Sequence, residues 1–175
     1  AKVPFDVIKD FTPVTLVAES PWVVVVNPAV AANNVKELIA LAKAKPDGLS
    51  FGSSGVGSST HLALELFNSL AQVKIAHIPY KGSPEVVTDL LAGRIQGYFS
   101  PASTVMGHVR AGKLRAIGTG TTTRVPALPN VPTVQEQGVA GFESTTWFGF
   151  WAPAGTPRAV IDRLWSEIAK IVQMP

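Results

Sequence analysis

Apolar and polar residues follow one another along this chain in blocks whose spacing alternates between that of a strand and that of a helix. Residues 21–26, PWVVVV, form a continuous β-branched run, which is typical of a strand buried on both faces of a sheet. Residues 34–45 then repeat leucine and alanine at helical spacing, and Asn34 and Glu37 have the spacing of a capping box. The pattern therefore predicts a strand followed by a helix.

The same alternation continues through the middle of the chain. Further strands are predicted at 49–53, 74–79, 94–99 and 114–120. The helix after the first of these is predicted to turn Leu62, Leu66, Phe67 and Leu70 inward, and two more helices are predicted at 84–93 and from Pro101 to near Gly112. Such a βαβ series predicts an α/β fold with a parallel or mostly parallel sheet covered by helices.

Three pairs of a hydroxyl residue and a proline predict where helices begin. In each pair the first residue is expected to cap the helix and the proline to occupy its first turn. The pairs are Ser83-Pro84, Ser100-Pro101 and Thr156-Pro157.

The composition changes near residue 119. Residues 119–141 are rich in Thr, Pro and Gly and are predicted to be a connecting region, with one short helix at 133–138. Residues 148–153 again resemble a strand. A final amphipathic helix is predicted to bury a stripe formed by Val160, Ile161, Leu164, Ile168 and Ile171.

Composition excludes several functional classes. Hydrophobic residues make up 46% and charged residues 15% of 175 positions, which predicts a packed globular protein. The absence of cysteine excludes disulfides and thiolate ligands, and three widely spaced histidines predict neither a metal site nor a bound cofactor. The net charge of +3 comes from dispersed Lys and Arg, so no nucleic-acid partner is expected. Neither a membrane span nor a signal peptide is predicted in this chain.

The stretch FGSSGVGSST, residues 51–60, combines three glycines with five hydroxyl residues directly before a helix. It does not match the phosphate-binding loop of nucleotide hydrolases, because Ser58 stands where that motif needs lysine. The dinucleotide-binding fingerprint fails at Thr60, and the nucleophile elbow of hydrolases fails at Val56.

Two interpretations of this turn remain. Free N–H groups at a helix N-terminus, together with hydroxyl donors, suit a small anion such as a carboxylate. Alternatively, Ser58 or Ser59 simply caps the helix and the glycines allow the turn.

Five segments in order carry a resemblance to a known family. They are FGSSGVGSSTHLALELF, IAHIPYKGSPEVVTDLLAGRIQGYF, HVRAGKLRAIG, PALPNVPTVQEQG and TTWFGFWAPAGTP. In this order they resemble the extracytoplasmic substrate receptors of tripartite tricarboxylate transporters, the Bug-type proteins. The resemblance implies a type II periplasmic-binding-protein fold, in which two α/β lobes joined by crossover strands close on a small carboxylate.

The resemblance also implies a division of the chain. Residues 1–21 would be a crossover and a remnant of lobe one, 22–117 a complete second lobe, and 118–175 the return crossover with part of lobe one. The family's first strand with its Gly-rich turn, and its C-terminal end, would be missing. An incomplete lobe one is expected to favour dimerisation.

The resemblance assigns ligand-facing residues by position. They are Ser54, Gly55, Gly57, Ser58, Ser59 and Thr60 in the turn, then Lys81, Gly82 and Ser83, then Phe99 and Ser100, and finally Trp147. Many relatives have Asp at the position of Ser100, which could alternatively be a helix cap. Lys81 could instead be a solvated lysine, and Trp147 could belong to the core.

The resulting prediction is a non-enzymatic, periplasmic solute-binding protein that delivers a small carboxylate to the membrane permease subunits of such a transporter. Two alternatives stay open at this point. One is a serine hydrolase using Ser54 or Ser58 with His61 or His77, and the other is a ligand-sensing module for signalling. His77 itself is predicted to be a satisfied buried or edge residue rather than a base.

Overall fold

The computed structural model describes residues 4–174 and divides into two compact units. The larger unit comprises Ser20–Thr146. The smaller unit comprises the described residues up to Glu19 together with those from Trp147.

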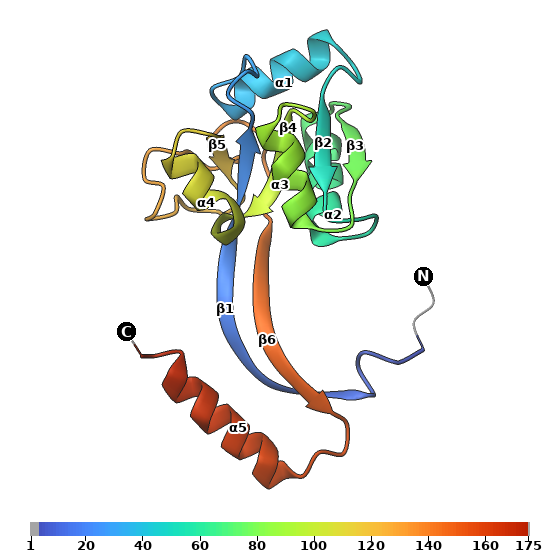
Figure 1. The fold of residues 1–175 in the computed structure, drawn as a ribbon, viewed down its shortest axis with the longest axis vertical. Coiled ribbons are helices and arrows are strands. Elements are labelled where there is room, and N and C mark those ends of the chain that lie inside the picture. Colours follow the sequence, from blue (N-terminus) through green and yellow to red (C-terminus); the bar gives the residue numbers. More distant parts are fainter. Residues whose placement is uncertain (1–3, 175) are drawn as a thin grey trace. The chain divides into compact units, whose positions relative to one another are not determined.

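The larger unit is a mixed α/β domain built on one sheet (Figure 1). Its strands lie in the order β3-β2-β4-β1-β5. Strand β2 is parallel to β3 and to β4, whereas β1 is antiparallel to β4 and to β5. The sheet is therefore mostly parallel, as predicted, with β1 as the reversed strand. The elements are β1 (Phe11–Val26), α1 (Val35–Ala44), β2 (Ser50–Ser53), α2 (Ser59–Ala71), β3 (Ala76–Pro79), α3 (Ser83–Leu91), β4 (Gly97–Pro101), α4 (Ala102–Arg110) and β5 (Arg115–Thr119).

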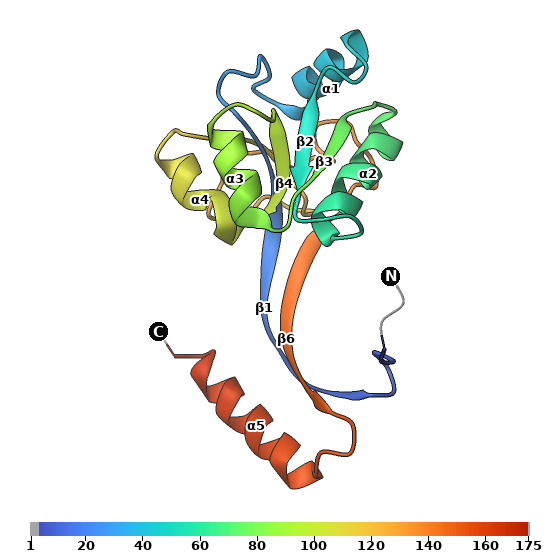
Figure 2. The same cartoon turned by 45° about the vertical axis from the view of Figure 1, so that its right-hand side comes forward.

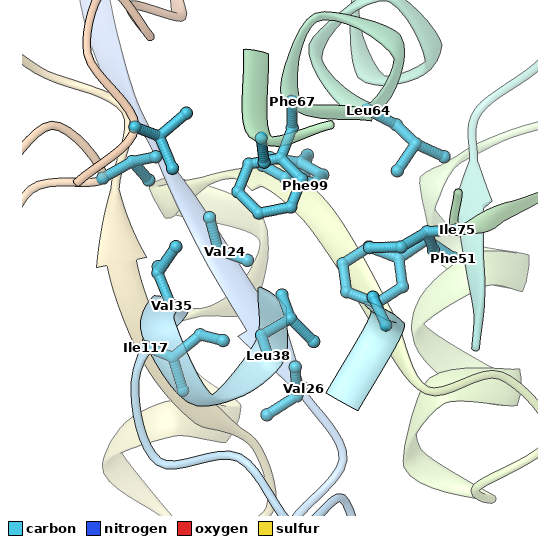
Figure 3. Packing of buried hydrophobic residues seen from close by; sticks show 14 of the residues in the cluster. Val24, Val26, Val35, Leu38, Phe51, Leu64, Phe67, Ile75, Phe99 and Ile117 are labelled. Atoms are coloured by element: carbon cyan, nitrogen blue, oxygen red, sulfur yellow. The ribbon is translucent and has the colours of Figure 1, made fainter. Parts of the chain in front are cut away.

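The predicted double burial of the β-branched run is confirmed. Alternate side chains of β1 enter different core clusters, because successive residues of a strand point to opposite faces. Val24 and Val26 pack with residues of α1 and α2, as Figure 3 shows, while Val23 and Val25 pack with residues of α3 and α4. Figure 2 shows α3 and α4 together on their face of the sheet.

Helix α2 buries a different face from the one predicted. Leu62, Leu66 and Leu70 are exposed, and of the four predicted residues only Phe67 is buried. The core side is instead formed by Thr60, Ala63, Leu64, Phe67 and Ala71. The predicted stripe was wrong because leucines occupy two neighbouring stripes on this helix, and the stripe with small residues packs against the sheet.

The three predicted hydroxyl caps are also wrong. Helix α3 has Gly82 as its N-cap, and Pro101 and Pro157 are the N-cap residues of α4 and of the last helix, all without a side-chain cap bond. The Asn34 cap is confirmed, since its Oδ1 accepts from the Glu37 N–H at 2.9 Å. In α4 and the last helix the proline itself takes the cap position, because its fixed φ, here −54° and −55°, fits it. In α3 the helix instead begins one residue earlier, so Ser83 is its first residue and Pro84 lies in its first turn.

Residues 134–138 form turns and Thr133 forms a single bridge to Thr119, in place of the short helix predicted at 133–138. The capping box itself is present, because the Glu136 N–H donates to Thr133 Oγ1 at 3.0 Å and the Thr133 N–H donates to Glu136 Oε2 at 2.7 Å. This reciprocal pair closes a turn that Gly138, at φ 104°, then ends.

The smaller unit contains the first half of β1, most of β6 (Thr145–Pro153) and α5 (Arg158–Ile171), and β6 pairs with β1. The burial predicted for the final helix is largely wrong. Within α5, Ile161 is buried, whereas Val160, Leu164 and Ile171 are exposed. This unit therefore carries much apolar surface.

Candidate ligand-binding site

The candidate site lies at one edge of the sheet in the larger unit. Strands β2, β3 and β4 run parallel, so their carboxyl ends meet at the same edge. The 51–60 turn leads from β2 into α2, and residues 80–82 lead from β3 into α3. In open α/β sheets, ligands bind outside the carboxyl ends of the strands, where helix N-termini gather.

The 51–60 turn is closed by its own hydroxyl groups. Thr60 Oγ1 accepts from the Ser54 N–H at 2.9 Å and lies 3.0 Å from Ser54 Oγ and 2.9 Å from Ser58 Oγ. Gly55 and Gly57 have φ values of 136° and 78°, which other residues rarely adopt. Glycines and hydroxyls together thus fix one tight loop against the helix.

Ser58 is the N-cap of α2, as one of the two interpretations predicted. Its Oγ accepts from the His61 N–H at 3.3 Å and donates to the Gly55 carbonyl at 2.7 Å. Ser59 is exposed, and among the residues that the structure describes no acceptor faces the N–H groups of Ser59 and Thr60. Capping thus accounts for Ser58. Of the two remaining donors, one belongs to the exposed Ser59 and the other to the buried Thr60.

Tyr98 was not among the predicted site residues. Its side chain is fully buried, and its hydroxyl lies 2.8 Å from Ser83 Oγ at the start of α3. Burial raises the pKa of Tyr98, while hydrogen bonding with Ser83, Thr60 and Ser100 acts in the opposite direction. The phenol therefore remains neutral and bonds to the Ser83 hydroxyl at the start of α3.

The other predicted residues of the larger unit differ in their placement. Ser100 is fully buried in β4, and its Oγ donates to the Pro101 carbonyl at 3.1 Å. The Lys81 side chain is exposed, while its N–H donates to Glu85 Oε2 at 3.1 Å. Gly82 contributes only backbone, at the N-cap of α3.

Of the remaining predicted residues, Phe99 belongs to the core of the larger unit and Trp147 to the smaller unit. The Phe99 ring is in the core, 5.3 Å from the Phe67 ring and 5.7 Å from the Phe142 ring between centroids. Trp147 belongs to the smaller unit, is 56% exposed and lines an apolar groove of about 720 Å³ with Trp151. The ring of Phe99 is thus a core component, and Trp147 remains a predicted contact only.

The proposed serine–histidine pairs of a hydrolase do not form. Ser54 and Ser58 bond to Thr60 and Gly55, not to an imidazole. The serine beside a histidine is Ser53, whose Oγ bonds to His77 Nε2 but is fully buried. A buried hydroxyl offers no approach to a substrate, so the geometry disfavours this chemistry.

Among residues 4–174, no group of three or more His, Cys, Asp or Glu lies close enough to hold a metal ion. None of the helices in this range has the length and apolar character needed to cross a membrane.

Comparison with protein families gives a match over the whole chain. Residues 1–175 match the model of the tripartite tricarboxylate transporter family receptor. A Pseudomonas sp. (strain P51) protein, the UPF0065 protein in the tcbD-tcbE intergenic region, is 41% identical over 99% of this chain and 52% of its own length. Protein BugT of Bordetella pertussis is 36% identical over 98% of this chain and 52% of its own length. The chain spans about half the length of the curated relatives it matches.

Solved structures give the same result. Rpa4515 of R. palustris, solved with adipate, has a TM-score of 0.93 at 34% identity, covering 97% of this chain and 57% of its own. MatC of Rhodopseudomonas palustris, with bound malate, has a TM-score of 0.91 at 26% identity, covering 99% of this chain and 59% of its own. The periplasmic binding protein BugD has a TM-score of 0.89 at 32% identity, covering 94% of this chain and 55% of its own. BugD is described as a periplasmic binding protein, and the matching family model describes a receptor.

Proposed function

Because the chain belongs to the tripartite tricarboxylate transporter receptor family, we propose that it serves in a periplasmic solute-binding protein that captures a small carboxylate. The observation that carries this proposal is the 51–60 turn, where the free N–H groups of Ser59 and Thr60 adjoin a cluster of hydroxyls. Relatives bound to adipate and to malate support a dicarboxylate as the ligand class.

The donors in this turn suit reversible capture of an anion. A helix N-terminus carries roughly half a positive charge, which is worth about 0.3–1 kcal/mol to an anion at an exposed site. Hydroxyls of Ser54 and Ser59 add neutral donors without a fixed countercharge. Such a site holds a carboxylate and lets it leave again.

The proposed partner is the permease of a tripartite tricarboxylate transporter. The family match supports it, since the family is defined by receptors of that transporter. The alternative, a sensing module, predicts a different partner. Affinity capture from membranes that contain the permease subunits, compared with membranes that contain sensor kinases, distinguishes the two.

Calorimetric titration against mono-, di- and tricarboxylates tests the proposed ligand class. We expect saturable binding with a preference for a dicarboxylate such as adipate or malate. The same titration on a chimera completed with the remaining segments of Rpa4515 tests whether this lobe needs its counterpart. If neither protein binds any carboxylate, the proposed function is wrong.

Substitution of Ser59 by leucine tests the site directly. Ser59 is exposed and does not cap α2, so the change leaves the fold intact while it blocks the free N–H groups. Ser103, an exposed serine in the first turn of α4, provides the matched control Ser103→Leu. We expect only Ser59→Leu to abolish binding, and unchanged affinity in this variant would remove the turn from the site.

A further inference from the structure

Two imidazole rings stack face to face beside the 51–60 turn. The centroids of His61 and His77 are 3.9 Å apart, and their planes are inclined by 17°. His61 stands in the first turn of α2, and His77 in the edge strand β3. Each ring contacts the turn through a different group.

His61 holds the turn at Gly57. The Gly57 N–H donates to His61 Nδ1 at 3.1 Å, so Nδ1 supplies a lone pair and the ring proton is on Nε2. Nε2 lies 3.7 Å from Glu65 Oε1. A doubly protonated ring carries N–H groups on both nitrogens, and the one on Nδ1 would then face the Gly57 N–H. Protonation of His61 therefore breaks this hydrogen bond.

His77 holds the turn at its other end. Its Nε2 bonds to Ser53 Oγ, which in turn accepts from the Gly55 N–H at 3.2 Å. Burial lowers the pKa of His77, and the neighbouring charge of a protonated His61 lowers it further. Glu65, on the next turn of α2, is the carboxylate that acts on the pair and opposes this effect.

We propose that His61 is a positioning residue for the carboxylate site, which holds the 51–60 turn in its binding shape only while the stacked pair with His77 is neutral. The functional part of this inference rests on the proposed function, because the turn is the proposed anion site. Protonation of His61 frees Gly57 and loosens the loop that precedes the donors of Ser59 and Thr60. Ligand capture is thereby coupled to the protonation state of His61.

The positioning step is tested first without any ligand. Nuclear magnetic resonance of the isotopically labelled chain follows the Gly57 amide and the histidine rings from pH 8 to pH 5. We expect the Gly57 amide to shift in step with the titration of His61. A Gly57 amide that does not follow His61 overturns the inference, whether or not the chain binds a carboxylate.

Three variants test the consequence for binding, with adipate and malate as probes. His61→Asn places an amide oxygen near the position of Nδ1 and does not titrate, whereas His61→Phe keeps a stacking ring without an acceptor. His108→Asn is the matched control, since His108 stands on α4. Affinity is measured at pH 7.5 and at pH 5.5. Protonation of the probe itself changes the affinity of every variant equally, so differences between variants come from the protein.

Between pH 7.5 and pH 5.5 we expect the affinity of the wild type and of His108→Asn to fall. The affinity of His61→Asn should fall about three- to tenfold less, because the loss of one intramolecular hydrogen bond corresponds to a factor of this size. His61→Phe should bind about three- to tenfold more weakly than the wild type at pH 7.5. Equal pH dependence in the wild type and His61→Asn overturns the coupling. If no protein binds either probe at any pH, the proposed function fails, while the Gly57 amide still decides the positioning role.

Discussion

The hydroxyl of Tyr98 lies 2.8 Å from Oγ of Ser83 and so joins the buried side of β4 to the first turn of α3. The N-terminus of α3 is thereby tied to the strand that follows it in sequence. A neutral hydroxyl, rather than a charged side chain, provides this link.

Removal of this hydroxyl should destabilise the larger unit. In Tyr98→Phe the Ser83 hydroxyl loses its partner in a partly buried position, which should lower the free energy of unfolding by about 1–2 kcal/mol. Urea denaturation at pH 7 measures the change. The control is Tyr80→Phe, which removes the hydrogen bond from the Tyr80 hydroxyl to Asp89. Its effect should be smaller, because the Asp89 carboxylate keeps its hydrogen bond from Arg94. Equal stabilities of Tyr98→Phe and the wild type would contradict this role.

Replacement of Phe99 should test its placement in the core. Phe99 is 1% exposed and packs against the rings of Phe51 and Phe67, so Phe99→Ala should cost about 3–5 kcal/mol. Trp147→Ala removes an exposed ring and should change stability by less than about 1 kcal/mol. Chemical denaturation of both variants compares them. A small effect of Phe99→Ala would return this ring to the candidate site.

The difference between Tyr98 and Phe99 shows where sequence reasoning reached its limit. Neighbouring residues of a strand point to opposite faces, so only one of the two can reach the Ser83 hydroxyl. The resemblance assigned Phe99 to the ligand-facing residues, and that assignment stays a prediction. In the structure the Phe99 ring lies in the core, and Tyr98 carries the hydrogen bond to Ser83. Which of the two side chains faces α3 depends on which helix covers which face of the sheet, and the residue pattern of the strand alone does not predict this.

Other parts of the fold were predictable because one local pattern sufficed. The run Val23–Val26 could only be a strand buried on both faces, and the structure confirms it. The glycine and hydroxyl density of residues 51–60 likewise predicted a tight turn before a helix. On α2, by contrast, Leu62 and Leu64 gave two possible buried faces, and packing against the sheet decided between them. The stacking of His61 on His77 needed the pairing of β2 with β3 and was not predictable.

Acidification should destabilise the protein through His77. Its pKa in the folded chain is lowered from 6.5, so the folded state favours the neutral ring. The corresponding stability is present above pH 6.5 and is lost as the pH falls through 6.5 towards the lower folded-state pKa. The carboxyls of Glu37, Asp89 and Glu136 remain ionised in this window because hydrogen bonds lower their pKa values.

Urea denaturation at a series of pH values from 8 to 5.5 measures this dependence. His77→Gln keeps an acceptor or donor for Ser53 but does not titrate, so the free energy of unfolding should vary less with pH than in the wild type. The variant His108→Gln should retain the wild-type dependence. An unchanged slope in His77→Gln would show that another group carries it.

The same substitution at two glycines should have opposite effects. Gly57 has φ 78° and no atom within 4 Å of an added Cβ, so Gly57→Ala introduces backbone strain without a clash. The left-handed conformation costs a non-glycine residue roughly 1–2 kcal/mol, and the variant should lose about that much stability. Gly107 lies inside α4, also with open space around an added Cβ, and Gly107→Ala should gain about 0.5–1 kcal/mol. Thermal and urea denaturation of the two variants compare them. If both changes had the same sign, the backbone of Gly57, and with it the tight shape of the 51–60 turn, would have to be revised.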